Sequence, residues 1–192
     1  GFFQSAEGLG QIKSYAVGPE TLYETPLAGY IFTPSSTGIQ TLPPARVGWE
    51  YGRVASSRRS IEVVDLPEEA SESGAVGDFE VSSRLDRREV STGERLELTV
   101  RIEGTGNLNF LQLPRIDAPG FQLVEEDEES SYQPSLEGYS GWREFRYGLL
   151  AEEAGLSKVL MPSMAAVSPE DGRVYYTSAR EYKVEVSSRS DE

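Results

Sequence analysis

The chain has 192 residues with no cysteine and no histidine, and 32 Asp and Glu outnumber 18 Lys and Arg, giving a formal net charge of −14 at pH 7. Without cysteine there is no disulfide framework and no thiolate metal site, and without histidine neither a Ser-His-Asp nor a Cys-His catalytic group can form within the chain. Because the negative field repels phosphates, we expect neither nucleic acid nor an anionic membrane surface as a partner.

The first third of the sequence shows short apolar stretches bounded by turn residues, a pattern typical of β-strands. In chain order these are Tyr30 and Phe32, a turn at Thr37 and Gly38, a rise to Leu42, the pair Pro43 and Pro44, and the alternating Ile61 and Val63. A stretch of Pro, Glu, Ser, Ala and Gly then runs from Leu66 to Gly77 with almost nothing to bury, which predicts a linker over residues 67–77.

The alternation is stronger after this linker. The residues Leu96, Leu98, Val100 and Ile102 alternate with charged and polar residues, which predicts a strand with one buried and one solvated face. Shorter strands are predicted at Phe79 and Val81, at Phe121 and Leu123, and from Phe145 to Leu149, and Asp171-Gly172 indicates a hairpin. Helical periodicity is nowhere sustained past two turns, so we expect an all-β chain.

The order of features repeats about 115 residues later. The second copy comprises Phe145, Tyr147 and Leu149, a turn at Ala154 and Gly155, a rise through Val159 and Leu160 to Pro162, and Tyr182, Val184 and Val186. The simplest interpretation is two tandem β-sandwich domains, residues 1–66 and 78–188. Either the first domain is abbreviated or the sequence begins partway through it; we favour the second explanation and expect this domain to be the less well ordered.

The segment from Val81 to Pro114 resembles a known family. It contains the turn Gly93-Glu94, the strand Leu96 to Ile102 and the run Gly104-Thr105-Gly106-Asn107-Leu108, and Phe145, Tyr147, Gly155, Pro162 and the closing strand up to Val186 extend the likeness. On these residues the chain resembles the repeated extracytoplasmic domain of the BatD family, the aerotolerance or oxygen-tolerance proteins. The resemblance covers the second domain and residues 30–64 of the first.

The resemblance implies tandem Ig-like domains in an envelope protein, on the periplasmic or extracytoplasmic side, with a membrane-anchoring helix outside this sequence. It also implies protein partners with von Willebrand A domains and a MoxR-type ATPase, in a system linked to oxidative stress. Since the chain has neither cysteine nor a redox motif, we expect any protective role to act through assembly, with no catalysis, no cofactor and no resident metal.

The run Gly104-Thr105-Gly106-Asn107 is the first candidate site. A phosphate-binding loop would need a helix to follow it, whereas Leu108, Phe110, Leu111 and Leu113 indicate a strand. We therefore expect a structural turn that connects strands, with Gly104 or Gly106 at positive φ and the Asn107 side chain bonded to nearby backbone.

The acidic run Glu125, Glu126, Asp127, Glu128 and Glu129 is the second candidate. Consecutive strand residues point to opposite faces, so they cannot all converge on one cation. A solvated edge that discourages pairing between sheets is the expected role. A von Willebrand A partner would normally offer a metal that an acidic side chain can complete, which makes Glu125, Glu126 and Asp127 candidate interaction residues.

Aromatic residues are the third candidate, because their rings bring a large contact area at low entropic cost. Trp49, Tyr132 and Tyr139 lie among polar residues and glycines and are candidates for a binding patch, whereas Trp142, Phe145 and Tyr147 are expected in the core. Two functions remain open. The leading one is a non-catalytic module that binds a protein through an edge strand or loop end, and the alternative is a carbohydrate-binding or carbohydrate-processing domain.

Overall fold

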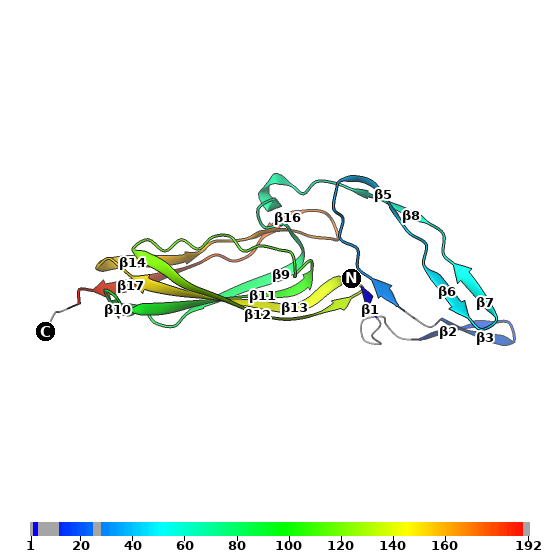
Figure 1. Cartoon of the computed structure of the whole chain (residues 1–192), viewed down its shortest axis with the longest axis horizontal. Coiled ribbons are helices and arrows are strands. Elements are labelled where there is room, and N and C mark those ends of the chain that lie inside the picture. The colour runs from blue at the N-terminus through cyan, green and yellow to red at the C-terminus, as the bar shows by residue number, and fades with distance from the viewer. Residues whose placement is uncertain (1, 4–11, 25–27, 190–192) are drawn as a thin grey trace. The chain divides into compact units, whose positions relative to one another are not determined.

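The computed structural model describes residues 2–3, 12–24 and 28–189 of the chain. It divides into two compact units, one formed by Gly1–Ile31 with Pro67–Glu192 and the other by Phe32–Leu66. Figure 1 shows the strands of both. The strands are β1 (Phe2–Phe3), β2 (Lys13–Val17), β3 (Glu20–Glu24), β4 (Gly29–Tyr30), β5 (Gly38–Leu42), β6 (Arg46–Trp49), β7 (Gly52–Ala55), β8 (Arg59–Val63), β9 (Ala75–Leu85), β10 (Glu89–Ser91), β11 (Arg95–Gly106), β12 (Phe121–Ser135), β13 (Gly138–Ala151), β14 (Gly155–Met161), β15 (Ala165–Val167), β16 (Val174–Tyr176) and β17 (Arg180–Ser187).

The residues from β9 onward form a β-sandwich. A six-stranded sheet has the order β12-β13-β11-β9-β15-β16, and a three-stranded sheet has the order β10-β17-β14. Most neighbours are antiparallel, whereas β10 runs parallel to β17 and β9 runs parallel to β15. The chain is all-β, with the architecture of an Ig-like sandwich, as the sequence predicts.

Alternating side chains from the two sheets fill the core. Leu96, Leu98, Val100 and Ile102 of β11 are at most 1% exposed, and Val159 and Val184 face them from the smaller sheet. Full burial of an aliphatic side chain of this size contributes roughly 1.5–3 kcal/mol. The predicted half-buried strand is therefore confirmed, and it forms the centre of the sandwich.

The stretch expected as a linker lies against this sandwich. Residues Glu68–Ala70 form a single 3-10 turn, Ala70 and Ala75 are fully buried, and β9 begins at Ala75. The Ser73 hydroxyl donates to the Ala165 carbonyl at 2.5 Å. The expectation that this stretch has almost nothing to bury is wrong, because alanine and serine are small enough to pack closely beside β15.

The strands before residue 67 form two-stranded ladders. β2 pairs with β3 and β1 with β4 in the first unit, and β5 pairs with β8 and β6 with β7 in the second. Among the described residues between 12 and 66, only Gly29, which has no side chain, is buried. Two-stranded ribbons without a packed face are marginally stable at best. The tandem count and the domain limits 1–66 and 78–188 stay predictions.

Candidate protein-interaction surface

The free edge of β12 is the most extensive backbone edge of the sandwich. β12 has 15 residues, pairs antiparallel with β13 from Phe121 to Ser135, and has no other partner strand among those that the structure describes. All its residues are exposed or half-buried. The edge is therefore a row of backbone donors and acceptors that another chain can reach.

The acidic run lies in the first half of this edge strand. A bulge between Leu123 and Glu125 shifts the register, after which Glu126 stands opposite Tyr147 and Asp127 opposite Arg146. Tyr147 is 8% exposed and belongs to the core, so Glu126 lies on the inward face of the sheet. Asp127 lies on the outward face, because successive strand residues alternate.

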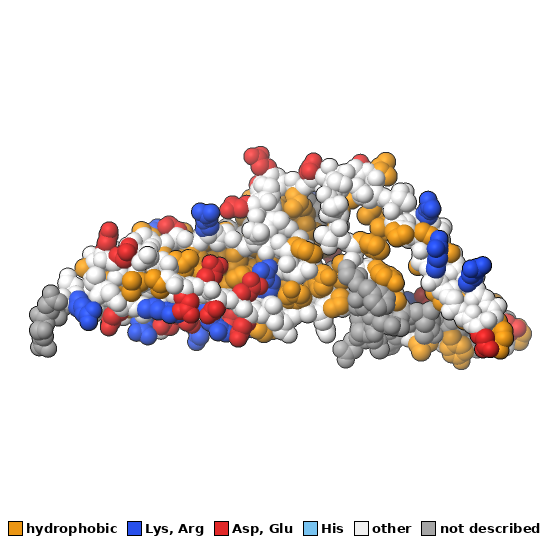
Figure 2. Space-filling model, in the orientation of Figure 1, with side chains coloured by type: hydrophobic (Ala, Val, Ile, Leu, Met, Phe, Trp, Pro, Cys, Tyr) orange, Lys and Arg blue, Asp and Glu red, His pale blue; other side chains and the backbone are white. Residues whose placement is uncertain are grey.

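Three members of the run are held by arginines of β11 and β13. Glu125 pairs with Arg95, Glu128 with Arg143 at 2.7 Å, and Glu129 with Arg146 at 2.5 Å. Figure 2 shows acidic and basic side chains intermixed over this part of the sandwich. Glu126 and Asp127 make no ion pair with any described residue. They are the two carboxylates of the run that remain available to a partner.

Arg143 ties the loop after β11 to the large sheet. Its guanidinium donates to the carbonyls of Leu108 at 3.1 Å and Leu111 at 2.9 Å, as well as to Glu128. The side chain is 14% exposed and lies 5.0 Å from the ring centre of Phe145. Charge-assisted hydrogen bonds are about twice as strong as neutral ones. This arginine therefore holds the loop after β11 in place beside the large sheet.

An apolar cleft of about 430 Å³ opens beside the inward face of β12. Its walls are the segment from Leu113 to Ala118 and the strand residues Phe121, Leu123, Tyr147 and Leu149, with Arg115 and Glu126 as its charged residues. The Tyr147 hydroxyl has no hydrogen-bond partner among the described residues. Burial, followed by the charges of Glu126 and Glu128, raises the pKa of Tyr147 to about 12, so this hydroxyl is a donor at neutral pH.

The aromatic candidates lie in different units. Tyr132 and Tyr139 pack edge to face with ring centres 5.7 Å apart, at the β12–β13 hairpin end. Trp49 belongs to the second unit, is 57% exposed and lies over Gly52 in the β6–β7 ladder. Tyr132 is 39% exposed. The structure therefore brings two of the three rings together on β12 and β13.

The run at residues 104–107 holds strands together. Gly104 and Gly106 have φ of 150° and 151°, and they lie at the end of β11, between β9 and β13. Asn107 accepts a hydrogen bond from the Val76 amide at 2.8 Å and donates to the Gly74 carbonyl at 2.7 Å. Its partners are distant in sequence, which corrects the expectation of local bonding. A turn, and no strand, follows at Leu108.

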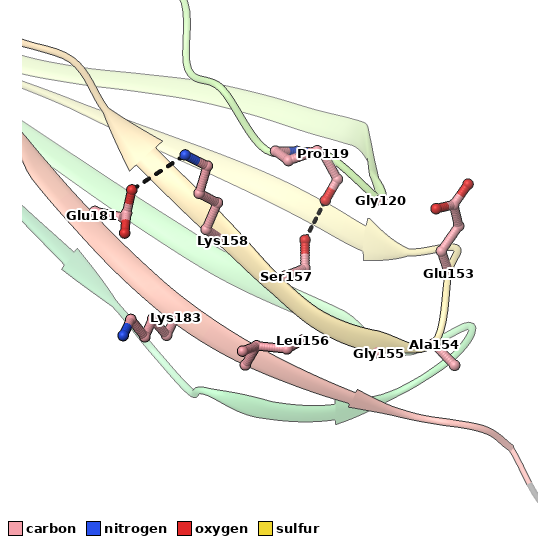
Figure 3. A pocket seen from close by; sticks show the side chains of 10 residues that line it. All are labelled: Pro119, Gly120, Glu153, Ala154, Gly155, Leu156, Ser157, Lys158, Glu181 and Lys183. Carbon is pink, nitrogen blue, oxygen red and sulfur yellow. Dashed lines mark hydrogen bonds and ion pairs between the residues drawn. The ribbon is translucent and has the colours of Figure 1, made fainter.

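A second hollow lies at the end of the small sheet, where β14 and β17 meet the loop before β12 (Figure 3). Two of its polar side chains are satisfied inside it, since Lys158 pairs with Glu181 at 3.3 Å and the Ser157 hydroxyl donates to the Pro119 carbonyl. We regard the β12 surface as the better candidate, because an unpaired backbone edge, an apolar cleft and unpaired carboxylates adjoin there.

The sequence did not indicate the cleft or the role of Tyr147 in it. Strict alternation from Leu123 would assign Glu125 to the same face as Leu123, but the bulge places Glu126 there instead. A bulge leaves no reliable sequence signal when no glycine marks it. The signal that was available is the apolar and proline-containing segment from Leu113 to Ala118, directly before the acidic strand.

Fold and surface together define an Ig-like β-sandwich protein with one long, acidic and unpaired edge. A family model described as BatD DUF11 like domain matches residues 83–186. Because this match spans more than half of the 192 residues, the chain belongs to the BatD family, and the resemblance found in the sequence is confirmed. No curated protein matches the sequence.

Proposed function

We propose that this chain is a non-catalytic protein-interaction module of a membrane-anchored BatD-like protein on the extracytoplasmic side of the cell envelope. The observation that supports it best is the edge of β12, a 15-residue strand whose alternate residues direct backbone groups outward; β1 contacts β12 without pairing with it. Pairing of a partner strand with such an edge is a common mode of protein recognition. Among the described residues no helix is long and apolar enough to cross a membrane.

The proposed partner is a membrane protein with a von Willebrand A domain, acting with a MoxR-type ATPase in a system linked to oxygen or stress tolerance. Family membership supports this partner, and Asp127 supplies the chemistry for it. A carboxylate that is free of ion pairs can complete the coordination of a cation held by another protein. Asp127 meets this condition on the outward face, whereas Glu125 and Glu129 are held by arginines.

Affinity capture tests the proposal. The chain is immobilised, a solubilised envelope extract of the source organism is passed over it, and bound proteins are identified by mass spectrometry before and after a wash with chelator. We expect a von Willebrand A protein that is released by the chelator and is lost with Asp127→Asn. Two results together would contradict the proposal and favour carbohydrate binding. The first is capture of glycosylated molecules alone, and the second is a shift of the tryptophan fluorescence of the chain when glycans are added.

A further inference from the structure

The unpaired edge of β12 defines the form of its ligand. A strand edge presents backbone N–H and C=O groups in the strand plane, and only another extended chain matches them in number and spacing. The acidic half of β12, from Phe121 to Glu129, is the part that also borders the cleft. A chain paired there would place alternate side chains on the inward and outward faces of the large sheet.

The inward face selects an apolar side chain. Leu113, Ile116 and Leu123 line the cleft beside the edge, and the ring of Tyr147 forms part of its wall. Leu123 is 52% exposed although its neighbours in the cleft are apolar. Covering it with an aliphatic or aromatic side chain would remove apolar surface from water.

The charge of β12 selects basic side chains. The strand contains five Asp and Glu and no Lys or Arg, and its two unpaired carboxylates lie on opposite faces. Opposite charges on directly paired strand residues stabilise the pair, and like charges destabilise it. Pairing of β12 with β12 of a second copy would bring two acidic runs together, so the charge pattern opposes self-association through this edge.

We propose that the free edge of β12 accepts an extended segment of a partner protein in which Lys or Arg alternates with apolar residues. An apolar side chain of this segment enters the cleft lined by Leu113, Ile116 and Leu123 on the inward face. Its cations then all lie on the outward face, where one pairs with Asp127. This inference rests on the proposed function as a protein-interaction module, and it specifies the mode and the chemistry of the contact. It does not require the metal of a von Willebrand A domain.

Peptide binding to the whole chain tests this inference. The probe is a fluorescein-labelled peptide of alternating Lys and Val, compared with a peptide of the same composition in which the lysines form one block. We expect the alternating peptide to bind more tightly by fluorescence anisotropy and to protect amides of β12 from hydrogen exchange. The variant Asp127→Asn should weaken binding about two- to fivefold, the range for one exposed ion pair.

A matched control removes the same charge elsewhere. Glu68→Gln changes one exposed carboxylate of the 3-10 turn, outside the large sheet, and should leave peptide affinity within about 1.5-fold if exposed charges act only locally. Leu123→Ser should weaken binding with the acidic run intact. The inference would be overturned if the peptide with its lysines in one block bound equally well, or if amides outside β12 were protected. Either result would mean that general charge attraction, without strand pairing, explains the binding.

The capture experiment separates the two proposals. Capture of a von Willebrand A protein that excess alternating peptide does not displace would overturn the edge inference and leave the proposed function standing. If the peptide binds along β12 but no von Willebrand A protein is captured, the edge inference is supported and the proposed von Willebrand A partner is rejected. Displacement of the captured protein by the peptide would support both.

Discussion

Arg143 shows how a single side chain organises the surface beside β12. It satisfies the carbonyls of Leu108 and Leu111 and the carboxylate of Glu128 at once, while its guanidinium lies over Phe145. No other described side chain donates to these three acceptors. Removing the guanidinium would therefore leave the carbonyls of the buried residues Leu108 and Leu111 without a side-chain donor.

Arg143→Met should lower the free energy of unfolding by about 2–3 kcal/mol, the cost of leaving buried acceptors without a donor. Urea unfolding measures it as a lower midpoint at unchanged slope. The control is Arg173→Met, because Arg173 is 85% exposed and its ion pair with Asp171 is solvated; this variant should cost less than about 1 kcal/mol. Equal losses in both variants would show that Arg143 does not hold the loop.

Tyr147 should couple stability to alkaline pH. Burial first, and the charges of Glu126 and Glu128 next, raise its pKa from the usual 10.0 of a tyrosine to about 12. Below pH 10 the folded and unfolded states both keep the proton, so this contribution is complete there. Between pH 10 and 12 the unfolded state loses the proton first, so stability falls as pH rises. Unfolding of Tyr147→Phe should show a smaller loss over this window; an identical loss would contradict the assignment.

At the scale of elements, two glycines of the large sheet lie very close to neighbouring atoms, one to a side chain and the other to backbone. A Cβ at Gly148 would lie 2.8 Å from Nε of Arg95, the far end of a flexible side chain that crosses this glycine to reach Glu125. A Cβ at Gly104 would meet the backbone carbonyl of Asp78, and Gly104 has φ of 150°. The first approach can relax, and the second cannot.

Gly104→Ala should therefore destabilise the sandwich by about 3 kcal/mol or more, because it combines a disfavoured φ with a backbone clash. Gly148→Ala should cost about 1 kcal/mol or less, since only the Arg95–Glu125 pair is displaced. Thermal unfolding of the two variants measures the difference directly. A reversed order of the two melting temperatures would contradict this account of the glycines.

Strand prediction succeeded where burial enforces alternation. The pattern Leu96, Leu98, Val100 and Ile102 predicted β11, because each of these side chains has to face the core. It failed to assign faces on β12, since the bulge after Leu123 shifts the alternation by one residue. The cleft was also missed, because it depends on the path of residues 113–118, which have no regular structure. The residue types of the edge were predictable, and their grouping was not.

At the scale of the whole molecule, regular strand pairing and core formation are not the same thing. The strands β5 to β8 are paired as regularly as those of the sandwich, yet Ile39 is 78% and Val54 59% exposed. The repeat in the sequence predicted a rise to Leu42 and a strand at Ile61 and Val63, which correspond to β5 and β8, but it did not predict β6 and β7. It could not predict a core, because burial depends on which surfaces meet, and that depends on more than alternation.

Amides of β5 to β8 should exchange with solvent much faster than amides of β11. The backbone hydrogen bonds of the two-stranded ladders open without exposing a core, so their opening costs little, whereas opening β11 requires global unfolding. Native-state hydrogen exchange measures both within one sample. Equal protection of the two regions would contradict the expectation from the sequence and would indicate that the ladders are held by contacts of their own.

The parallel pairing of β10 with β17 gives the sandwich a mechanical property. β17 is the last strand, and the backbone bonds from Glu185 N to Arg88 O and from Thr92 N to Ser187 O join it to β10, near the first strand of the sandwich. Tension applied between residues 67 and 189 pulls these two strands along their length, in opposite directions. The bonds then carry the load together and do not break one after another, so the domain should resist stretching between these two points.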